Sequence, residues 1–330
     1  MEQSALAAPF APAFSSKEGY DPNQEEVIER WRSAMDALAA GKLSWEKFLQ
    51  GKLIAEHPAR FLSTSEAGQS LLHLAILSNR VDIVAEILSS FPQLKWRRNS
   101  LNWTPLELAS FLPHEAILRL LQPSLTATFL EQANVAIPDI GKMGCLPSLE
   151  YLPQPRFESQ QVFEEIVEKA KKAKTEDAIP PEKIWMGIYF DQEIQDGSHP
   201  KVSIRFIDEK VGFGVFAEQR IPSCAYAGEY RGQILERKVK PPREKVHCVR
   251  YTTWEMGRRK FIIDAETKGN FTRFINHSSK PNLSLQSVYW RGIPRMIFVA
   301  LKEIHEGTQL TFDYGTFFWK ECSQTPVLFE

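Results

Sequence analysis

Two short stretches in the carboxyl-terminal half decide the fold: Arg273-Phe-Ile-Asn-His-Ser278 and, about 35 residues later, Thr311-Phe-Asp-Tyr-Gly315. Two further stretches precede them in the chain, Gly212-Phe-Gly-Val-Phe-Ala217 and Gly228-Glu-Tyr-Arg-Gly232. Each one alone is weak evidence, since two glycines one residue apart occur by chance in many proteins. All four in this order, within about 100 residues, form a specific pattern.

From Ile184 onward the chain consists of short apolar and aromatic runs separated by Gly, Pro and Asp, without long helices between them. This texture predicts a mostly-β domain rather than the alternating strands and helices of a nucleotide-binding sheet. The runs that we expect to form strands are Ile184–Phe190, Val202–Ile207, Gly214–Ala217, Phe261–Ile263 and Met296–Ala300.

The four stretches resemble the SET family of protein-lysine methyltransferases. The resemblance covers roughly residues 201–319, about a third of the chain, and implies a SET β-fold with a pseudoknot, its core at 201–315. It also implies S-adenosylmethionine as cofactor, a lysine of a protein as methyl acceptor, and no metal ion. A Rossmann-type methyltransferase is disfavoured, because no third glycine and no long helix follow Gly214.

Glycine and polar residues of these stretches are expected to hold the cofactor. Gly212 and Gly214 allow a ligand to approach the backbone closely, although a plain tight turn is the alternative. In the family, the Asn side chain and the His backbone hold the amino group and adenine of the cofactor, and the resemblance gives these roles to Asn276 and His277. The expected cofactor-binding residues are Gly212, Phe213, Gly214, Arg273, Asn276, His277, Tyr314 and Phe318.

Tyrosines are expected at the reacting atoms. A lysine has a pKa near ~10.4, so it must lose its proton and be held in an apolar, aromatic channel before its nitrogen can accept a methyl group. The resemblance makes Tyr314 the main catalytic residue and Tyr230 the second, which also lines the lysine channel. Phe312 leaves room that a tyrosine hydroxyl would fill, which favours di- or trimethylation. Phe318 and Trp319 are expected to close the site, with simple core packing as the alternative.

The chain departs from the family pattern at two points. Many members have a zinc-binding cysteine where this chain has Ser279, and here only Cys322 follows, so we expect no zinc site. A further channel tyrosine is usual before the Asp-Ala strand. Counting without gaps from Gly212 puts Cys248 there, and Tyr251, three residues later, becomes the candidate for the channel.

An internal repeat lies in the amino-terminal half. Gly68-Gln-Ser-Leu-Leu-His-Leu-Ala75 is echoed, with a period of 34, by Asn102-Trp-Thr-Pro-Leu-Glu-Leu-Ala109. Each copy is followed by an amphipathic segment, Val81–Leu88 or Glu115–Leu121. Period and opening resemble the ankyrin repeat, which implies a module that binds a protein partner. Two unrelated helical hairpins are the alternative.

The predicted organisation is multidomain, with an α-helical first part and a mostly-β second part. A stripe of apolar residues predicts a helix from Glu25 to Ala40, a second helix runs from Ser44 to about Glu56, and a charged helix from Glu158 to Lys174. The expected parts are a flexible tail at 1–24, helical ankyrin-like repeats at 25–136 (repeats at about 68–100 and 102–134), a linker and helix at 137–183, and a SET domain at 184–330.

Composition indicates where in the cell the protein acts and which partners it binds. A formal net charge of -1 argues against a wholesale nucleic-acid binder. The four cysteines lie far apart and favour a reducing, intracellular location, and neither a signal peptide nor a membrane span is expected. A chromatin enzyme would be nuclear. Ankyrin-like repeats joined to a zinc-free SET domain also resemble effectors that bacteria deliver into the nucleus or cytoplasm of a host cell.

The substrate is left open by the sequence. Between Arg231 and Lys260 there are ten Lys or Arg against three Glu, which would repel a basic histone tail and could contact nucleosomal DNA or an acidic partner. A solvated variable loop is the alternative. The leading hypothesis is a histone-lysine methyltransferase, and the others are methylation of a non-histone protein and an inert interaction module.

Overall fold

The computed structural model describes residues 22–51, 64–122, 150–237, 247–254, 261–315 and 318. The chain forms two compact units, one up to Leu71 and the other from Leu72 onward. The sequence predicted that the helical repeats end at residue 136, and this boundary stays a prediction. The second unit also contains the second copy of the internal repeat, residues 102–109.

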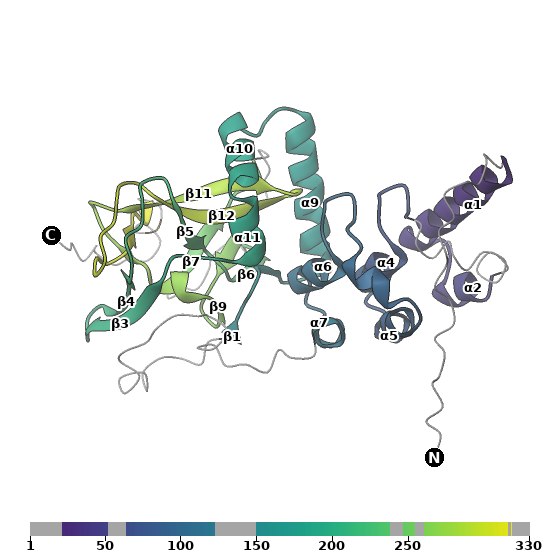
Figure 1. The fold of residues 1–330 in the computed structure, drawn as a ribbon, viewed down its shortest axis with the longest axis horizontal. Coiled ribbons are helices and arrows are strands. Elements are labelled where there is room, and N and C mark those ends of the chain that lie inside the picture. The colour runs from purple at the N-terminus through teal and green to yellow at the C-terminus, as the bar shows by residue number, and fades with distance from the viewer. Residues whose placement is uncertain are drawn as a thin grey trace, which may run out of the picture. The chain divides into compact units, whose positions relative to one another are not determined.

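The first unit contains α1 (Pro22–Ala39) and α2 (Trp45–Leu49), both labelled in Figure 1. Trp31 of α1 is fully buried and meets Phe48 of α2 edge to face, with ring centroids 5.7 Å apart. The stripe of apolar residues therefore predicted α1 correctly. The second helix begins as expected, with the Ser44 hydroxyl accepting from the Lys47 amide, but it ends at Leu49. Residues 52–63 lie outside the described part.

Two helix pairs follow the internal repeat. The first is α4 (Leu71–Leu77) with α5 (Val81–Ser90), and the second is α6 (Pro105–Phe111) with α7 (Glu115–Leu121), with the short 3-10 helix η2 (Pro92–Trp96) between the pairs. Thr104 starts α6 with a capping box, in which its hydroxyl accepts from the Glu107 amide and the Glu107 carboxylate accepts from the Thr104 amide. The predicted helices are present, and their ankyrin identity stays a prediction.

Three helices precede the β-domain: α9 (Gln160–Thr175), α10 (Pro181–Tyr189) and α11 (Asp191–Asp196). The prediction of a strand at Ile184–Phe190 is wrong, because Pro181 in the first turn starts a helix over these residues. Helix α10 lies on strand β11, and a Cβ at Gly187 would come within 1.9 Å of the Tyr289 carbonyl oxygen. The charged helix predicted at 158–174 is α9.

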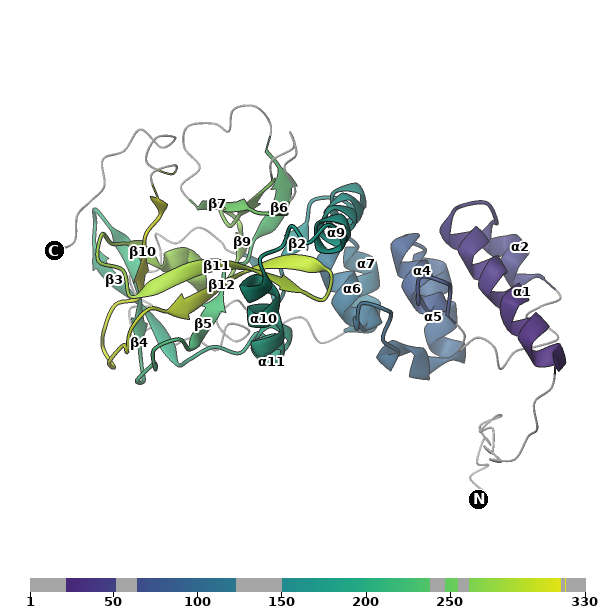
Figure 2. The ribbon, with the colours of Figure 1, turned by 90° about the horizontal axis from the view of Figure 1, so that it is seen from above.

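The rest of the second unit is built from short strands (Figures 1 and 2). A five-stranded sheet has the order β10-β13-β11-β12-β5, a four-stranded sheet the order β2-β6-β8-β7, and β3-β4 and β1-β9 form two-stranded sheets. The strands are β1 (Glu150–Tyr151), β2 (Arg156–Phe157), β3 (Val202–Asp208), β4 (Gly212–Ala217), β5 (Tyr226–Glu229), β6 (Gln233–Glu236), β7 (Cys248–Tyr251), β8 (Phe261–Asp264), β9 (Lys268–Gly269), β10 (Asn276–His277), β11 (Leu283–Trp290), β12 (Ile293–Ala300) and β13 (Thr311–Phe312).

The long hairpin β11-β12 forms the centre of the five-stranded sheet. Its strands pair antiparallel from Leu283 with Ala300 to Trp290 with Ile293. Arg291 and Gly292 connect them, both with positive φ (44° and 91°), as a two-residue turn of the primed kind requires. Apart from Ile184–Phe190, the runs expected to be strands are strands. No helix in the described ranges is long and apolar enough to cross a membrane.

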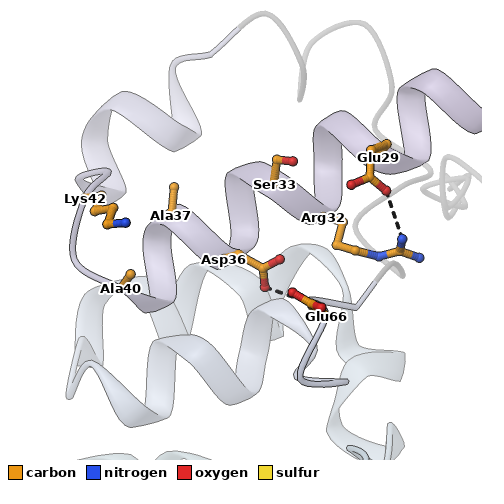
Figure 3. Close-up of a pocket in the computed structure, with 8 residues that line it drawn as sticks. All are labelled: Glu29, Arg32, Ser33, Asp36, Ala37, Ala40, Lys42 and Glu66. Carbon is orange, nitrogen blue, oxygen red and sulfur yellow. Dashed lines mark hydrogen bonds and ion pairs between the residues drawn. The ribbon is translucent and has the colours of Figure 1, made fainter.

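A polar groove in the first unit runs along α1 (Figure 3). Arg32 pairs with Glu29 at 2.9 Å, and the amide of Glu66 donates to the carboxylate of Asp36 at 3.0 Å. The groove is lined by Glu29, Arg32, Ser33, Asp36, Ala37, Ala40, Lys42 and Glu66. None of the site residues expected from the sequence belongs to this lining.

Candidate active site

The two stretches that decide the fold lie side by side. Strand β10 runs parallel to β13, with Asn276 opposite Thr311 and His277 opposite Phe312. The Asn282 side chain joins them further, since its amide nitrogen donates to the Gln309 carbonyl at 2.8 Å and its oxygen accepts from the Thr311 amide at 2.9 Å. The fold thereby brings residues 276–282 and 309–312 into direct contact.

A glycine-containing strand borders this place. The Asn276 side-chain amide donates to the Phe213 carbonyl at 3.0 Å, which fixes β4 against β10. Gly212 has a φ of 77°, a conformation that glycine adopts at little cost. A Cβ at Gly214 would lie 2.7 Å from Gln309 Nε2 and 3.2 Å from Asn276 Nδ2. Glycine therefore lets the side-chain amides of Gln309 and Asn276 pack closely on the backbone of β4.

The Gln309 side chain supplies a donor that nothing in the described ranges uses. Its Nε2 is buried and has no hydrogen-bond partner among those residues. A buried donor without a partner is costly, and a ligand that brings an acceptor removes the cost. The carboxylate of an amino acid is such an acceptor. The Gln309 amide therefore fits an acceptor such as the amino-acid end of the expected cofactor, and the four quoted stretches gave no sign of Gln309.

Tyr314 lies against β10. Its hydroxyl donates to the Ile275 carbonyl at 3.0 Å, and its amide donates to His277 Nδ1 at 3.2 Å. Its ring centroid is 4.7 Å from that of Phe312 and 4.7 Å from that of Phe318. Of the expected aromatic lid, Phe318 thus contacts Tyr314, and Trp319 lies outside the described residues.

His277 is held in its neutral form. Burial lowers the pKa of the imidazole, while Asp313 and a hydrogen bond with the Phe312 backbone act in the opposite direction. A nitrogen that accepts from the Tyr314 amide carries no proton, which agrees with that direction. The imidazole therefore serves as a neutral support for Tyr314.

Tyr230 lies immediately after β5 and is buried. Its amide donates to the Met296 carbonyl at 2.8 Å, and its ring lies 6.4 Å from that of Phe298. Phe298 in turn lies 5.0 Å from Phe312, so a row of aromatic rings leads from Tyr230 to Tyr314. Burial raises the pKa of both phenols above the ordinary range. Both hydroxyls therefore keep their protons at neutral pH.

Cys248, not Tyr251, lies with the two tyrosines. The groups whose charge states influence Tyr230 include Cys248 and Tyr314. The Tyr251 hydroxyl instead donates to the Pro294 carbonyl at 2.6 Å. Two residues three positions apart in a strand point to opposite faces, which explains why Tyr251 does not replace a side chain at position 248. The structure does not bring Tyr251 together with Tyr230 and Tyr314.

Arg273 and Phe213 form one wall of the site. Arg273 donates to the Glu266 carbonyl at 2.9 Å, and burial lowers the pKa of its guanidinium. Phe213 packs on Phe274, with ring centroids 6.3 Å apart, and on Phe206 at 5.5 Å. Arg273 is also close enough to Tyr230 to influence the pKa of its phenol.

Within the described ranges, no group of three or more His, Cys, Asp or Glu side chains is arranged to hold a metal ion. Ser279 is described, whereas Cys322 lies outside those ranges.

The family model of the SET domain matches residues 212–315. This match begins at the glycine strand and ends with the glycine after Tyr314, so it spans the site residues described above except Phe206 and Phe318. Residues 212–315 are a SET domain. The mostly-β fold and the cofactor-type glycine strand follow from that domain, which is about a third of the chain.

Curated relatives share this domain. Over 128 residues the chain is 34% identical to histone-lysine N-methyltransferase SETD2 of Mus musculus, covering 38% of this chain and 5% of the relative. It is 36% identical over 114 residues to putative histone-lysine N-methyltransferase ASHH4 of Arabidopsis thaliana, covering 32% and 31%. It is 30% identical over 130 residues to histone-lysine N-methyltransferase SUV39H1 of Xenopus laevis, covering 37% and 31%.

A solved structure, of KRYPTONITE in complex with mCHH DNA, H3(1-15) peptide and SAH, matches 37% of this chain and 25% of that chain. The sequence identity is 28% and the TM-score is 0.30. The chain spans less than a third of the length of the three curated relatives named above, SETD2, ASHH4 and SUV39H1. The similarity to them concerns the SET domain.

Proposed function

We propose that the chain is an S-adenosylmethionine-dependent protein-lysine N-methyltransferase. One observation carries this proposal. The region that matches the SET domain contains two protonated, buried phenols, those of Tyr230 and Tyr314, and a buried hydrogen-bond donor without a partner among the described residues, Gln309 Nε2, beside the glycine strand. Relatives that share the domain are named histone-lysine N-methyltransferases, which makes a lysine of a histone the first substrate to test.

The chain's residues hold the cofactor by its amino-acid end. Gly212 and Gly214 keep the backbone approachable, and the side chains of Asn276 and Gln309 offer hydrogen bonds next to it. S-adenosylmethionine supplies, when bound, a methyl group on a positively charged sulfur. Phe213 and Phe318, with the neutral His277, provide apolar surface around the cofactor.

The two phenols act on the amine of the substrate. Each can accept a hydrogen bond from the lysine nitrogen and so direct its lone pair toward the methyl group. Burial of the amine away from water disfavours a charged ammonium, which lowers the pKa of the bound lysine and helps it lose its proton. The lysine proton leaves to water, and no residue has to form a covalent bond with the substrate.

Phe312 and Cys248 leave the lysine channel wide. The Phe312 ring carries no hydroxyl to bind water beside Tyr314, and Cys248 is smaller than the tyrosine expected at its position. Space for methyl groups already on the nitrogen supports di- and trimethylation.

The partners follow from the proposed activity. The helix pairs, if they act as ankyrin-like repeats, select a protein partner, and the basic segment 231–260 offers nucleosomal DNA or an acidic protein a contact. A chromatin substrate places the chain in a nucleus, either that of its own cell or, for an effector, that of a host.

The test is transfer of labelled methyl groups from S-adenosylmethionine to histone octamers and, in parallel, to a whole-cell lysate. Label on histones supports the histone substrate, and label on a lysate protein alone supports a non-histone substrate. An excess of S-adenosylhomocysteine serves as the control that suppresses specific transfer. A chain that binds S-adenosylhomocysteine and labels neither preparation is an inert interaction module.

A further inference from the structure

Arg295 in β12 is fully buried, and its charge is compensated from two directions. Its Nε and Nη2 donate to the two carboxylate oxygens of Glu229, and Nη2 also donates to the Gln154 side chain at 2.6 Å. Its Nη1 has no hydrogen-bond partner among the described residues. The guanidinium faces instead the rings of Trp290 and Phe111, 4.6 and 5.7 Å from their centroids. An aromatic face attracts a desolvated cation, so Phe111 completes the surroundings of Arg295.

Phe111 comes from α6, in the second helix pair. Its ring packs on Trp103 of the same repeat at 5.4 Å, on Phe163 of α9 at 6.3 Å and on Phe157 of β2 at 6.4 Å. All four rings are buried, and α6 and α9 both contact β2, near which Figure 2 shows them. The helix pair is therefore anchored on the SET domain at Arg295.

Glu229 connects Arg295 to Tyr230. The Glu229 carbonyl accepts from the side chains of Asn270 at 3.0 Å and Thr272 at 3.1 Å, and the next amide, that of Tyr230, donates to the Met296 carbonyl at 2.8 Å. The peptide group before Tyr230 is thus held on both sides. The carboxylate of the same Glu229 is held by Arg295, so the guanidinium and the backbone that carries Tyr230 are joined through one residue.

The Glu229 carboxylate is paired with two buried guanidinium groups. Burial alone raises the pKa of Glu229, but Arg295 and Arg231 outweigh burial and hold the pKa below its ordinary value. Arg231 Nε donates to Glu229 at 3.0 Å. Glu229 therefore stays charged, and loss of Glu229 would leave the buried charge of Arg295 unpaired, which is strongly unfavourable.

We propose that the second helix pair positions Tyr230. Phe111 holds Arg295, Arg295 holds Glu229, and Glu229 fixes the backbone of Tyr230. Phe111, Arg295 and Glu229 are positioning residues, and the helix pair is part of the catalytic unit in addition to any partner that it binds. This inference rests on the proposed methyltransferase function, which gives Tyr230 its role.

Phe111→Leu tests the proposal, because leucine keeps apolar volume and removes the aromatic face. We expect kcat for methyl transfer to fall roughly ten-fold, with the KM for S-adenosylmethionine unchanged. Amide hydrogen exchange over residues 226–231, followed by mass spectrometry, should become faster. Phe163→Leu is the matched control, since Phe163 lies in the same ring cluster on the side of α9. It should lower the melting temperature to a similar extent and leave kcat and exchange at 226–231 unchanged.

The kinetic and exchange measurements on all variants are made below their melting temperatures. If Phe111→Leu does not fold, Phe111→Met takes its place. Equal kcat and equal exchange in the Phe111 and Phe163 variants would overturn the proposal, because the ring cluster would then only add stability. A wild-type protein that transfers no methyl group contradicts the proposed function instead. In that case the exchange comparison still decides whether the helix pair restrains Tyr230.

Discussion

The side-chain amide of Asn276 donates to the carbonyl oxygen of Phe213 at 3.0 Å, so two strands that are far apart in the sequence, β10 and β4, share one surface. Gly214 is the next residue after Phe213, and its missing side chain lets the amide groups of Asn276 and Gln309 pack on its backbone. This contact joins the glycine strand to the strand that carries Asn276 and His277.

Gly214→Ala should weaken binding of S-adenosylhomocysteine about ten-fold or more. The new methyl group would meet Gln309 Nε2 at 2.7 Å, and the side-chain end has to move away from the ligand. The fold should survive, because the nearest atoms are ends of flexible side chains. Calorimetric titration measures the affinity, and a thermal melt confirms folding. Glu306→Ala is the control, since Glu306 is exposed in a turn. Unchanged affinity in Gly214→Ala would place the cofactor elsewhere.

Phe312→Tyr should shift the product toward monomethyl-lysine. Phe312 lies 4.7 Å from Tyr314, and a hydroxyl added to its ring would occupy space that extra methyl groups on the substrate need. Mass spectrometry of the product at saturating cofactor counts the methyl groups. The same distribution of products from wild type and Phe312→Tyr would refute the role given to this position.

Alkylation of Cys248 should stop methyl transfer. The thiol is half-buried and influences the pKa of Tyr230, so a bulky adduct would enter the proposed lysine channel. Cys248→Ser should stay active after treatment with N-ethylmaleimide, whereas wild type loses activity. Cys224→Ser is the control, because Cys224 is exposed, and this variant should be inactivated like wild type. Equal sensitivity of both serine variants would remove Cys248 from the site.

Acid should destabilise the helix pairs through His73. Its ring is fully buried and bonds to the Trp103 carbonyl at 3.0 Å. Burial is the main cause that lowers the pKa of His73 to about 4, from 6.5. The unfolded chain binds a proton between these values while the folded chain does not, so stability is lost as the pH falls from about 6.5 toward 4. Between pH 7 and pH 5 the loss from this group is about 2 kcal/mol.

Urea unfolding at the two pH values measures that loss. His73→Gln keeps a donor for the Trp103 carbonyl and cannot titrate, so its stability should depend less on pH than that of wild type. The opposite ranking would mean that His73 is accessible to protons in the folded protein.

Much of the fold followed from local patterns. The stripe from Glu25 to Ala40 and the segments Val81–Leu88 and Glu115–Leu121 of the internal repeat predicted helices that are present. Ile184–Phe190 was misassigned, because a short apolar run does not by itself distinguish a strand from a helix that buries one face on a sheet, and Pro181 decided the outcome.

The sequence predicts the part of the candidate site whose residues belong to a recognisable motif. Asn276, His277 and Tyr314 are adjacent in space because β10 pairs with β13. Gln309, Glu229 and Arg295 owe their positions to contacts between segments distant in sequence, which no local pattern reveals. Tyr251 was nominated by its nearness to position 248 in the sequence, and the alternation of side chains along a strand sends it to the other face.

The measurement that tests the central claim most directly compares wild type with Tyr314→Phe in two assays, binding of S-adenosylhomocysteine and methyl transfer to lysine. The Tyr314 hydroxyl donates to the Ile275 carbonyl and lies beside His277. The account predicts affinity within about three-fold of wild type and a rate at least about 100-fold lower, because the hydroxyl acts on the reacting amine. Transfer by Tyr314→Phe at the wild-type rate would contradict it.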